Sequence, residues 1–179
     1  TFDLSNFLFI ISNGGIDEKI ILCFIKFLVI IFLFTGNVFS AGSSGGDTKS
    51  NYDQAVKLID SAKKNEKKGK KDKAQSKYEK AFKLLVKSNK KNPNKADTLN
   101  YLGFTSRKLG DFENGEKYYL EGLAIDPKHN GINEYLGELY VSTNRLNLAV
   151  ERLEVLKGCG CEEYDELKAI IDGEKVSKY

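Results

Sequence analysis

The tripeptide Tyr-Leu-Gly occurs twice in the sequence, at residues 101–103 and again 34 residues later at residues 135–137. The prolines Pro93 and Pro127 are separated by the same 34 residues. Because two independent features share one offset, the sequence predicts a repeated structural unit. This restricts the fold strongly, since each unit of such a repeat buries its apolar face only by stacking on its neighbours.

Apolar side chains recur at spacings of three and four residues from Tyr52 onwards, which predicts amphipathic helices. The first helix is predicted between Tyr52 and Lys67 and is broken at Gly69. A lysine-rich second helix is predicted from about Asp72 to Lys91, where an Asn-Pro pair ends it, because the residue before a proline avoids the helical region.

Two further helix pairs and a final helix are predicted after the first pair. Asp97 is predicted to cap the third helix, Gly110 and Asp111 to form the turn to the fourth, and Asn144 to mark the turn of the next pair. The segment at residues 162–172 carries apolar residues on one face and charges on the other. We expect it to be a closing helix that seals the open end of the stack.

These residues closely resemble a tetratricopeptide repeat (TPR), a 34-residue unit of two helices. The best match is residues 96–129, followed by a second copy at residues 130–156 and a degenerate first copy at residues 55–93. The resemblance implies an all-α, antiparallel helix-pair solenoid with a right-handed superhelix of about 2.5 to 3 repeats. The matched positions in residues 96–129 are Leu102, Gly103, Gly110, Asp111, Phe112, Tyr119 and Pro127.

The recurring Leu-Gly pair has a packing explanation in such a fold. We expect the glycine to bring the two helices of a unit close together, and the leucine to be buried against the next unit. Gly115 and Gly122 depart from the pattern of the family, which usually has alanine there. Each glycine costs ~1 kcal/mol of helix propensity, so this helix pair is predicted to be less stable than its neighbours.

The resemblance also implies a protein-interaction module that binds a peptide or a partner protein. The first helices of the pairs would line the concave face, with Phe104 as an apolar anchor and Arg107 setting the charge preference. Because Glu134 and Glu138 lie where some members clamp a terminal carboxylate, we expect a mixed-charge or basic ligand instead. The partner-binding residues implied by the register are Asn100, Phe104, Arg107, Lys108, Glu134, Glu138 and Val141.

No grouping of catalytic side chains is evident in the sequence. The single histidine, His129, lies in a polar turn with no serine, cysteine or carboxylate at a catalytic spacing, so we expect neither an enzyme nor a cofactor. Cys159 and Cys161 allow three interpretations: a local disulfide, two metal ligands that would need His129, or small residues in a turn. We favour the disulfide because exported cysteines meet an oxidising compartment.

Residues 1–40 read as a targeting segment. The run from Ile20 to Phe34 is almost wholly apolar but only 15 residues long, short of the ~20 needed to span a bilayer. We therefore favour a signal peptide cut after Ser40 over a permanent membrane segment. Residues 1–18 read as a mis-started extension, and residues 41–50 as a flexible linker before the repeat domain at residues 51–179. The predicted protein is a bacterial exported TPR protein, periplasmic or anchored in the inner membrane facing the periplasm.

The charges are divided between the two halves of the chain. Residues 41–95 have a net charge of +10 and residues 96–179 of −6. This leaves two alternatives open: a self-associating structural protein whose halves stack head to tail, and a membrane-surface adaptor that uses the lysines of residues 63–73. The N-terminal segment is a further candidate membrane contact. No aromatic residues alternate with these lysines, so nucleic acid is not expected as a partner.

Overall fold

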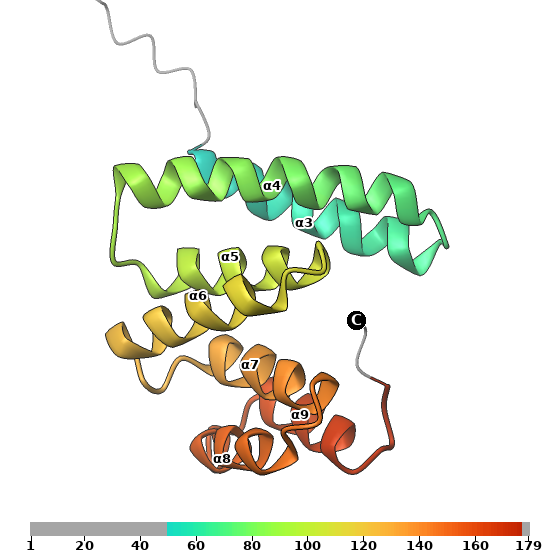
Figure 1. Cartoon of the computed structure of the whole chain (residues 1–179), viewed down its shortest axis with the longest axis vertical. Coiled ribbons are helices and arrows are strands. Elements are labelled where there is room, and N and C mark those ends of the chain that lie inside the picture. The colour runs from blue at the N-terminus through green and yellow to red at the C-terminus, as the bar shows by residue number, and fades with distance from the viewer. Residues whose placement is uncertain (1–49, 177–179) are drawn as a thin grey trace, which may run out of the picture. The chain divides into compact units, whose positions relative to one another are not determined.

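The computed structural model describes residues 50–176, which fold into seven α-helices without any β-strand (Figure 1). The predicted targeting segment and nearly all of the predicted linker lie outside the described residues. Within residues 50–176, no helix is long and apolar enough to cross a membrane. The helices are α3 (Asn51–Lys67), α4 (Lys71–Lys91), α5 (Ala96–Lys108), α6 (Phe112–Ile125), α7 (Asn130–Ser142), α8 (Leu146–Leu156) and α9 (Glu162–Ile171).

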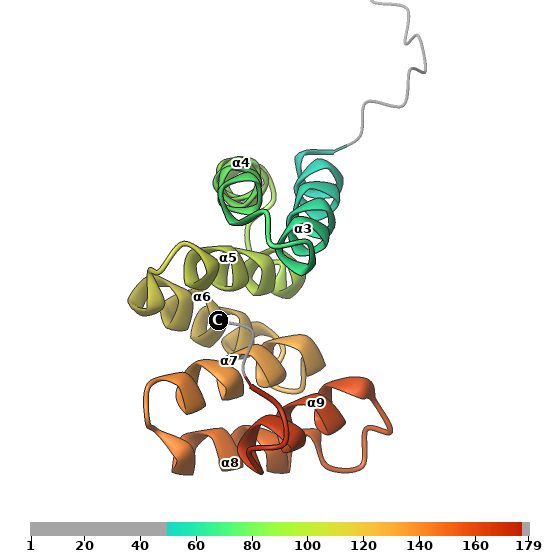
Figure 2. The ribbon, with the colours of Figure 1, turned by 90° about the vertical axis from the view of Figure 1, so that its right-hand side faces the viewer.

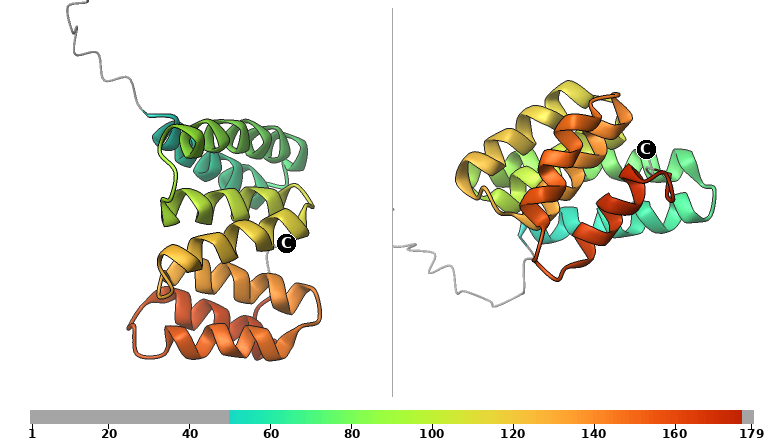
Figure 3. Two further views of the ribbon diagram at one scale, coloured as in Figure 1. Left: turned by 60° about the vertical axis from the view of Figure 1, so that its left-hand side comes forward. Right: turned by 90° about the horizontal axis from the view of Figure 1, so that it is seen from below.

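The helices pack as consecutive antiparallel pairs. Helix α3 packs against α4, α5 against α6 and α7 against α8, while α9 packs against both α7 and α8. The pairs are stacked in chain order, from α3 and α4 at one end to α8 and α9 at the other (Figure 2 and Figure 3). The first helices also contact one another along the stack, α3 with α5 and α5 with α7. The predicted all-α helix-pair solenoid is therefore confirmed for this part of the chain.

The helix boundaries follow the local sequence signals closely, with one exception. Ser50 starts α3 with a capping box, in which its hydroxyl accepts the Asp53 N–H at 3.1 Å and the Asp53 carboxylate accepts the Ser50 N–H at 3.2 Å. The prediction that Asp97 caps α5 is wrong. That helix begins at Ala96 after Lys95, and no side chain caps it. Asp97 therefore lies within the first turn, where its carboxylate is available to another partner.

The turns predicted within the three pairs have the left-handed backbone that reverses the chain. The φ angle is +70° at Gly69 and +86° at Gly110, a conformation that glycine adopts without steric cost. Asn144 has φ of 58°, and asparagine is among the few residues with a side chain that tolerate this region. These three residues keep the helices of each pair antiparallel.

The repeated Leu-Gly pair lies in the core. Leu102 and Leu136 are both fully buried, as expected for equivalent positions of two units. A Cβ atom added to Gly103 would lie 2.5 Å from the ring of Tyr119 on α6, so this glycine does bring the two helices of its pair together. At Gly137 the neighbour is different. An added Cβ would lie 2.5 Å from the side chain of Leu167, so the close approach is to α9 and not to α8.

The two unusual glycines of α6 lie at helix contacts. An added Cβ at Gly115 would lie 3.3 Å from the carbonyl oxygen of Gly103, which is closer than most Cβ contacts in proteins, so the backbone of α5 would have to shift slightly to admit it. At Gly122 it would lie 2.5 Å from the Ile132 side chain, closer than real atoms approach. The Ile132 side chain thus occupies the space that an alanine at position 122 would need, and the prediction of lower stability for this helix pair stays a prediction.

Candidate functional site

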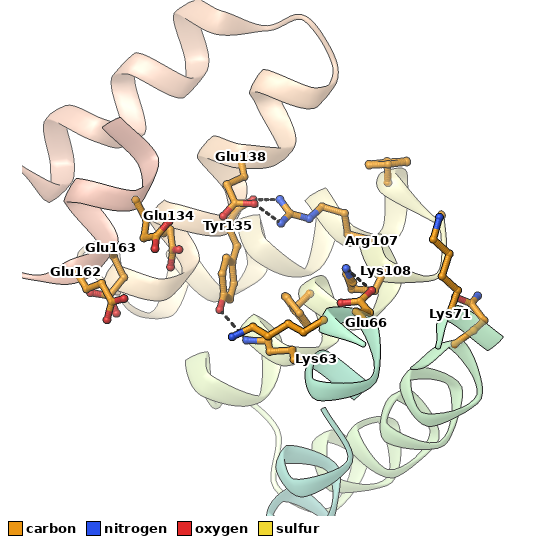
Figure 4. Close-up of a pocket in the computed structure, with 16 residues that line it drawn as sticks. Lys63, Glu66, Lys71, Arg107, Lys108, Glu134, Tyr135, Glu138, Glu162 and Glu163 are labelled. Carbon is orange, nitrogen blue, oxygen red and sulfur yellow. Dashed lines mark hydrogen bonds and ion pairs between the residues drawn. The ribbon is translucent and has the colours of Figure 1, made fainter. Parts of the chain in front are cut away.

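A cavity of about 1050 Å³ opens on the face where the first helices of the pairs meet (Figure 4). Its lining comes mainly from α3, α5, α7 and α9, with the start of α4 and the α5–α6 turn at one end. Charged side chains dominate it. The lining residues are Lys63, Glu66, Lys67, Lys71, Gln75, Phe104, Arg107, Lys108, Gly110, Phe112, Glu134, Tyr135, Glu138, Glu162, Glu163 and Glu166.

Phe104 forms the floor of the cavity and is not an exposed anchor. Only 2% of the residue is accessible. Its ring packs against the rings of Tyr78 and Tyr135, with centroids 5.9 and 5.2 Å away. Lys63 Nζ lies 4.6 Å above the ring centroid and donates a hydrogen bond of 3.4 Å to the Tyr135 hydroxyl. Lys63 therefore covers the Phe104 ring on the side that a partner would approach, so the predicted role of Phe104 as an apolar anchor does not fit this geometry.

The Arg107 guanidinium is also used in contacts within the fold. It is 2% accessible, and its Nη2 lies 2.9 Å from the Glu138 carboxylate, while Nη1 donates to the carbonyl oxygen of Tyr135. This pair joins α5 to α7. A second pair joins α5 to α3, with Lys108 Nζ 2.7 Å from the Glu66 carboxylate. The two ion pairs fix neighbouring first helices to each other beneath the cavity.

The side of the cavity formed by α7 and α9 is acidic. Four carboxylates there, Glu134, Glu162, Glu163 and Glu166, are called the acidic wall below. Burial raises the pKa of Glu134 to about 8, and the charges of Glu138, Glu163 and Glu166 add to the shift, while Lys63 opposes it. Glu134 is therefore largely protonated at neutral pH.

The opposite side of the cavity is basic. Lys63 and Lys67 come from the last two turns of α3, and Lys71 is the first residue of α4. These three residues are called the basic wall below. In the close-up, Lys71 lies on the far side of the cavity from Glu162 and Glu163, with Lys63 between them. The cavity thus has walls of opposite charge.

The structure brings together five of the seven predicted partner-binding residues and leaves out two. Asn100 does not line the cavity and is 7% accessible, and Val141 packs at the edge of the core formed by α6, α7 and α8. Sequence reasoning missed the contributions of α3 and α9. The lysine run at residues 63–73 and the acidic start of the closing helix were the available signals. The five residues at the cavity are Phe104, Arg107, Lys108, Glu134 and Glu138.

The remaining polar candidates lie away from the cavity. Cys159 and Cys161 are joined by a disulfide in the turn between α8 and α9. His129 caps α7, where its Nδ1 accepts the Ile132 N–H at 3.2 Å, and its Nε2 lies 3.1 Å from the Asp97 carboxylate. The sequence placed this histidine in a polar turn, with a metal-ligand role as an alternative, and did not predict a capping role. Residues 50–176 contain no cluster of histidine, cysteine and carboxylate side chains that could hold a metal ion.

Stacked antiparallel helix pairs, a 34-residue period and turns at equivalent positions define the class: the described residues form a TPR-like helical repeat. No protein-family model matches the sequence, and no curated protein matches it.

Several solved structures resemble this chain. One is the type III secretion translocator chaperone SycD of Yersinia enterocolitica, in an alternative dimer, with 20% identity and a TM-score of 0.49, covering 68% of this chain and 88% of that chain. The TPR domain of Arabidopsis OM64 has 16% identity and a TM-score of 0.45, and the match covers 70% of this chain and 100% of that domain. The first TPR of Spaghetti (RPAP3), bound to the HSP90 peptide SRMEEVD, has 20% identity and a TM-score of 0.44, and the match covers 70% of this chain and 96% of that chain. The fold assignment itself rests on the helix geometry of this chain.

Proposed function

We propose that this domain is a protein-interaction module that binds a segment of a partner protein, or a peptide, in the cavity on the face of α3, α5, α7 and α9. The observation that carries the proposal is the cavity itself. At about 1050 Å³ it is slightly larger than the ~300–1,000 Å³ typical of ligand-binding clefts, as expected for a site that takes a stretch of polypeptide. Helical repeat proteins use such faces as extended binding surfaces, because each repeat contributes one helix to a continuous surface.

The ion pairs beneath the cavity support a preformed site. Arg107–Glu138 and Lys108–Glu66 hold α3, α5 and α7 together through side chains that are mostly buried. A partner therefore does not have to order these helices when it binds. Binding that requires little ordering retains more of its favourable contact energy.

We propose further that the protein acts in the cell envelope. The support is the apolar run Ile20–Phe34 in the sequence, followed by compact residues around a cleavage site after Ser40. The disulfide between Cys159 and Cys161 fits an oxidising compartment. N-terminal sequencing of the protein recovered from envelope fractions should find Ala41 as the first residue, whereas recovery of the uncut chain from the cytosol would contradict the proposal.

Site-specific photo-cross-linking tests the binding face directly. A photoreactive amino acid is placed at Gln75 or Glu163, which line the cavity from opposite sides, and at Lys83, which is exposed on α4 outside it. We expect cross-links to the same partner from Gln75 and Glu163 but not from Lys83. Cross-links of equal yield from all three positions, or from Lys83 alone, would place the partner on another face.

A further inference from the structure

Three of the four side chains of the acidic wall have no cationic partner within the described part of the chain, whereas Glu166 is paired with Lys175. No hydrogen bond or ion pair joins Glu134, Glu162 or Glu163 to another residue of the described chain. Charges of one sign gathered around a cavity disfavour each other, and the effect is strongest at the most buried member. Glu134 shows this effect, since burial and the charges of its acidic neighbours raise its pKa to about 8. A cation placed at this wall would relieve the repulsion.

The chain itself provides one example of the group that this wall accepts. Lys175, in the segment after α9, reaches back so that its Nζ pairs with the carboxylate of Glu166. Glu166 lines the cavity and is mostly buried, whereas Lys175 is about half exposed. A lysine ammonium thus already occupies one edge of the acidic wall. Because the Lys175 side chain is about half exposed to water, which weakens such a pair, a competing cation could replace it.

Two of the three lysines of the basic wall carry positive charges that face the opposite side of the cavity. Lys67 and Lys71 are exposed, and neither forms an ion pair with another residue between positions 50 and 176. They come from the end of α3 and the start of α4, on the side of the cavity opposite to α9. An acidic group of a bound segment would meet these ammonium groups while a basic group met the acidic wall. Complementary charge patterns of this kind fix the register and orientation of a partner.

We propose that the cavity selects a partner segment of mixed charge, in which a lysine or arginine side chain lies among Glu134, Glu163 and Glu166 and an aspartate or glutamate faces Lys67 and Lys71. This inference rests on the proposed function and specifies the chemistry of its partner. The bound cation displaces Lys175 from Glu166. A segment that carries charges of only one sign is attracted to the wall of opposite charge and is repelled by the other wall.

Binding of such a cation is coupled to a proton. The charged groups that face Glu134 are Glu138 on its own helix, Glu163 and Glu166 on α9, and Lys63 on α3. In the free protein the carboxyl is mostly protonated below its pKa of about 8. A nearby ammonium or guanidinium favours the ionised form, so binding releases the proton. Affinity should therefore rise as the pH is raised towards 8 and become constant above it.

The test uses a display library of random 12-residue peptides selected on the immobilised whole chain. We expect the enriched peptides to contain both a basic and an acidic residue at a recurring separation. The double variant Glu163→Gln/Glu166→Gln should bind these peptides roughly tenfold more weakly or worse, the loss expected when charge-assisted hydrogen bonds are removed. Lys175→Gln should strengthen binding by about threefold, as a weak internal competitor is removed.

The matched control is Glu79→Gln/Glu121→Gln, which removes the same charge from exposed positions on α4 and α6 outside the cavity. It should leave the affinity unchanged, and thermal unfolding should show that both double variants remain folded. Cavity-bound peptides without any charge preference, or unchanged binding to the Glu163/Glu166 variant, would overturn this inference and leave the proposed function intact. Failure to select any peptide that competes at the cavity would contradict the proposed function itself.

Discussion

Removing one partner of the Arg107–Glu138 ion pair should destabilise the fold strongly, because both side chains are buried, and this can be measured. The Arg107 side chain has no accessible surface and that of Glu138 only 7%. Replacing one partner leaves the other charge buried without its counter-charge, which typically costs about 3–5 kcal/mol. We therefore expect Arg107→Met and Glu138→Met each to lower the free energy of unfolding by roughly that amount.

Replacing both partners should cost much less than the sum of the two single changes. In Arg107→Met/Glu138→Met neither buried charge remains, and apolar side chains of similar volume often replace a buried ion pair at little or no cost. The Tyr135 carbonyl oxygen loses its guanidinium donor in every variant that lacks Arg107. A residual cost of ~1 kcal/mol is expected from that lost hydrogen bond.

Urea unfolding followed by circular dichroism gives the four free energies of this double-mutant cycle. We expect a coupling energy of several kcal/mol and, for each single variant, a midpoint of thermal unfolding lowered by roughly 10 to 20 °C for a domain of this size. Single variants that lose less than about 1 kcal/mol would refute the reasoning, because they would show that water or another group satisfies the remaining charge.

Three further predictions concern separate parts of the structure. Gly103→Ala should lower the stability by about 1–3 kcal/mol, because its Cβ would lie 2.5 Å from the buried Tyr119 ring; urea unfolding without a measurable loss would contradict the close packing. The folded-state pKa of Glu134 is raised from 4.5 to about 8, so this group destabilises the fold progressively as the pH rises between those values. Glu134→Gln should therefore be as stable as the original chain near pH 4.5 but more stable at pH 8, and identical pH profiles would refute the shift. Reduction of the Cys159–Cys161 disulfide should cost less than about 2 kcal/mol, because the closed loop is very short. Thermal unfolding with and without reductant measures this, and two free thiols in the native protein would show that the bridge is absent.

The repeat architecture could be predicted from the sequence because its signals are local. Gly69, Gly110 and Asn144 mark turns through their own backbone preferences, and the buried Leu102 and Leu136 follow from helical periodicity. Such features depend on a few neighbouring residues. The order of the helices along the stack then follows from the short turns and the repeat period.

The candidate site could be predicted only in part, because it depends on contacts between distant segments. Phe104 and Arg107 occupy positions at the cavity, but Lys63 covers the first and Glu138 pairs with the second. Neither contact has a sequence signal, since the partners are 41 and 31 residues away. Of the four residues of the acidic wall, only Glu134 was predicted from the sequence. The other three lie on α9, and the register of the two repeats does not indicate which face of that closing helix lines the cavity.

The same limit explains the wrong prediction for Asp97. Asp97 was expected to cap its own helix and instead lies beside His129, which caps the helix 34 residues later. A capping role for histidine has weak sequence preference, whereas aspartate is a common cap. Only the packing of α5 against α7 brings these two side chains together.

The most direct test of the account is NMR spectroscopy of the isotope-labelled chain during titration with one selected peptide. The account predicts amide shift changes at cavity residues from both walls, including Lys67, Lys71, Glu134 and Glu163, with no change at Lys83 or Glu121 on the outer faces. Shift changes confined to the outer helices α4 and α6, with the cavity residues unaffected, would contradict it.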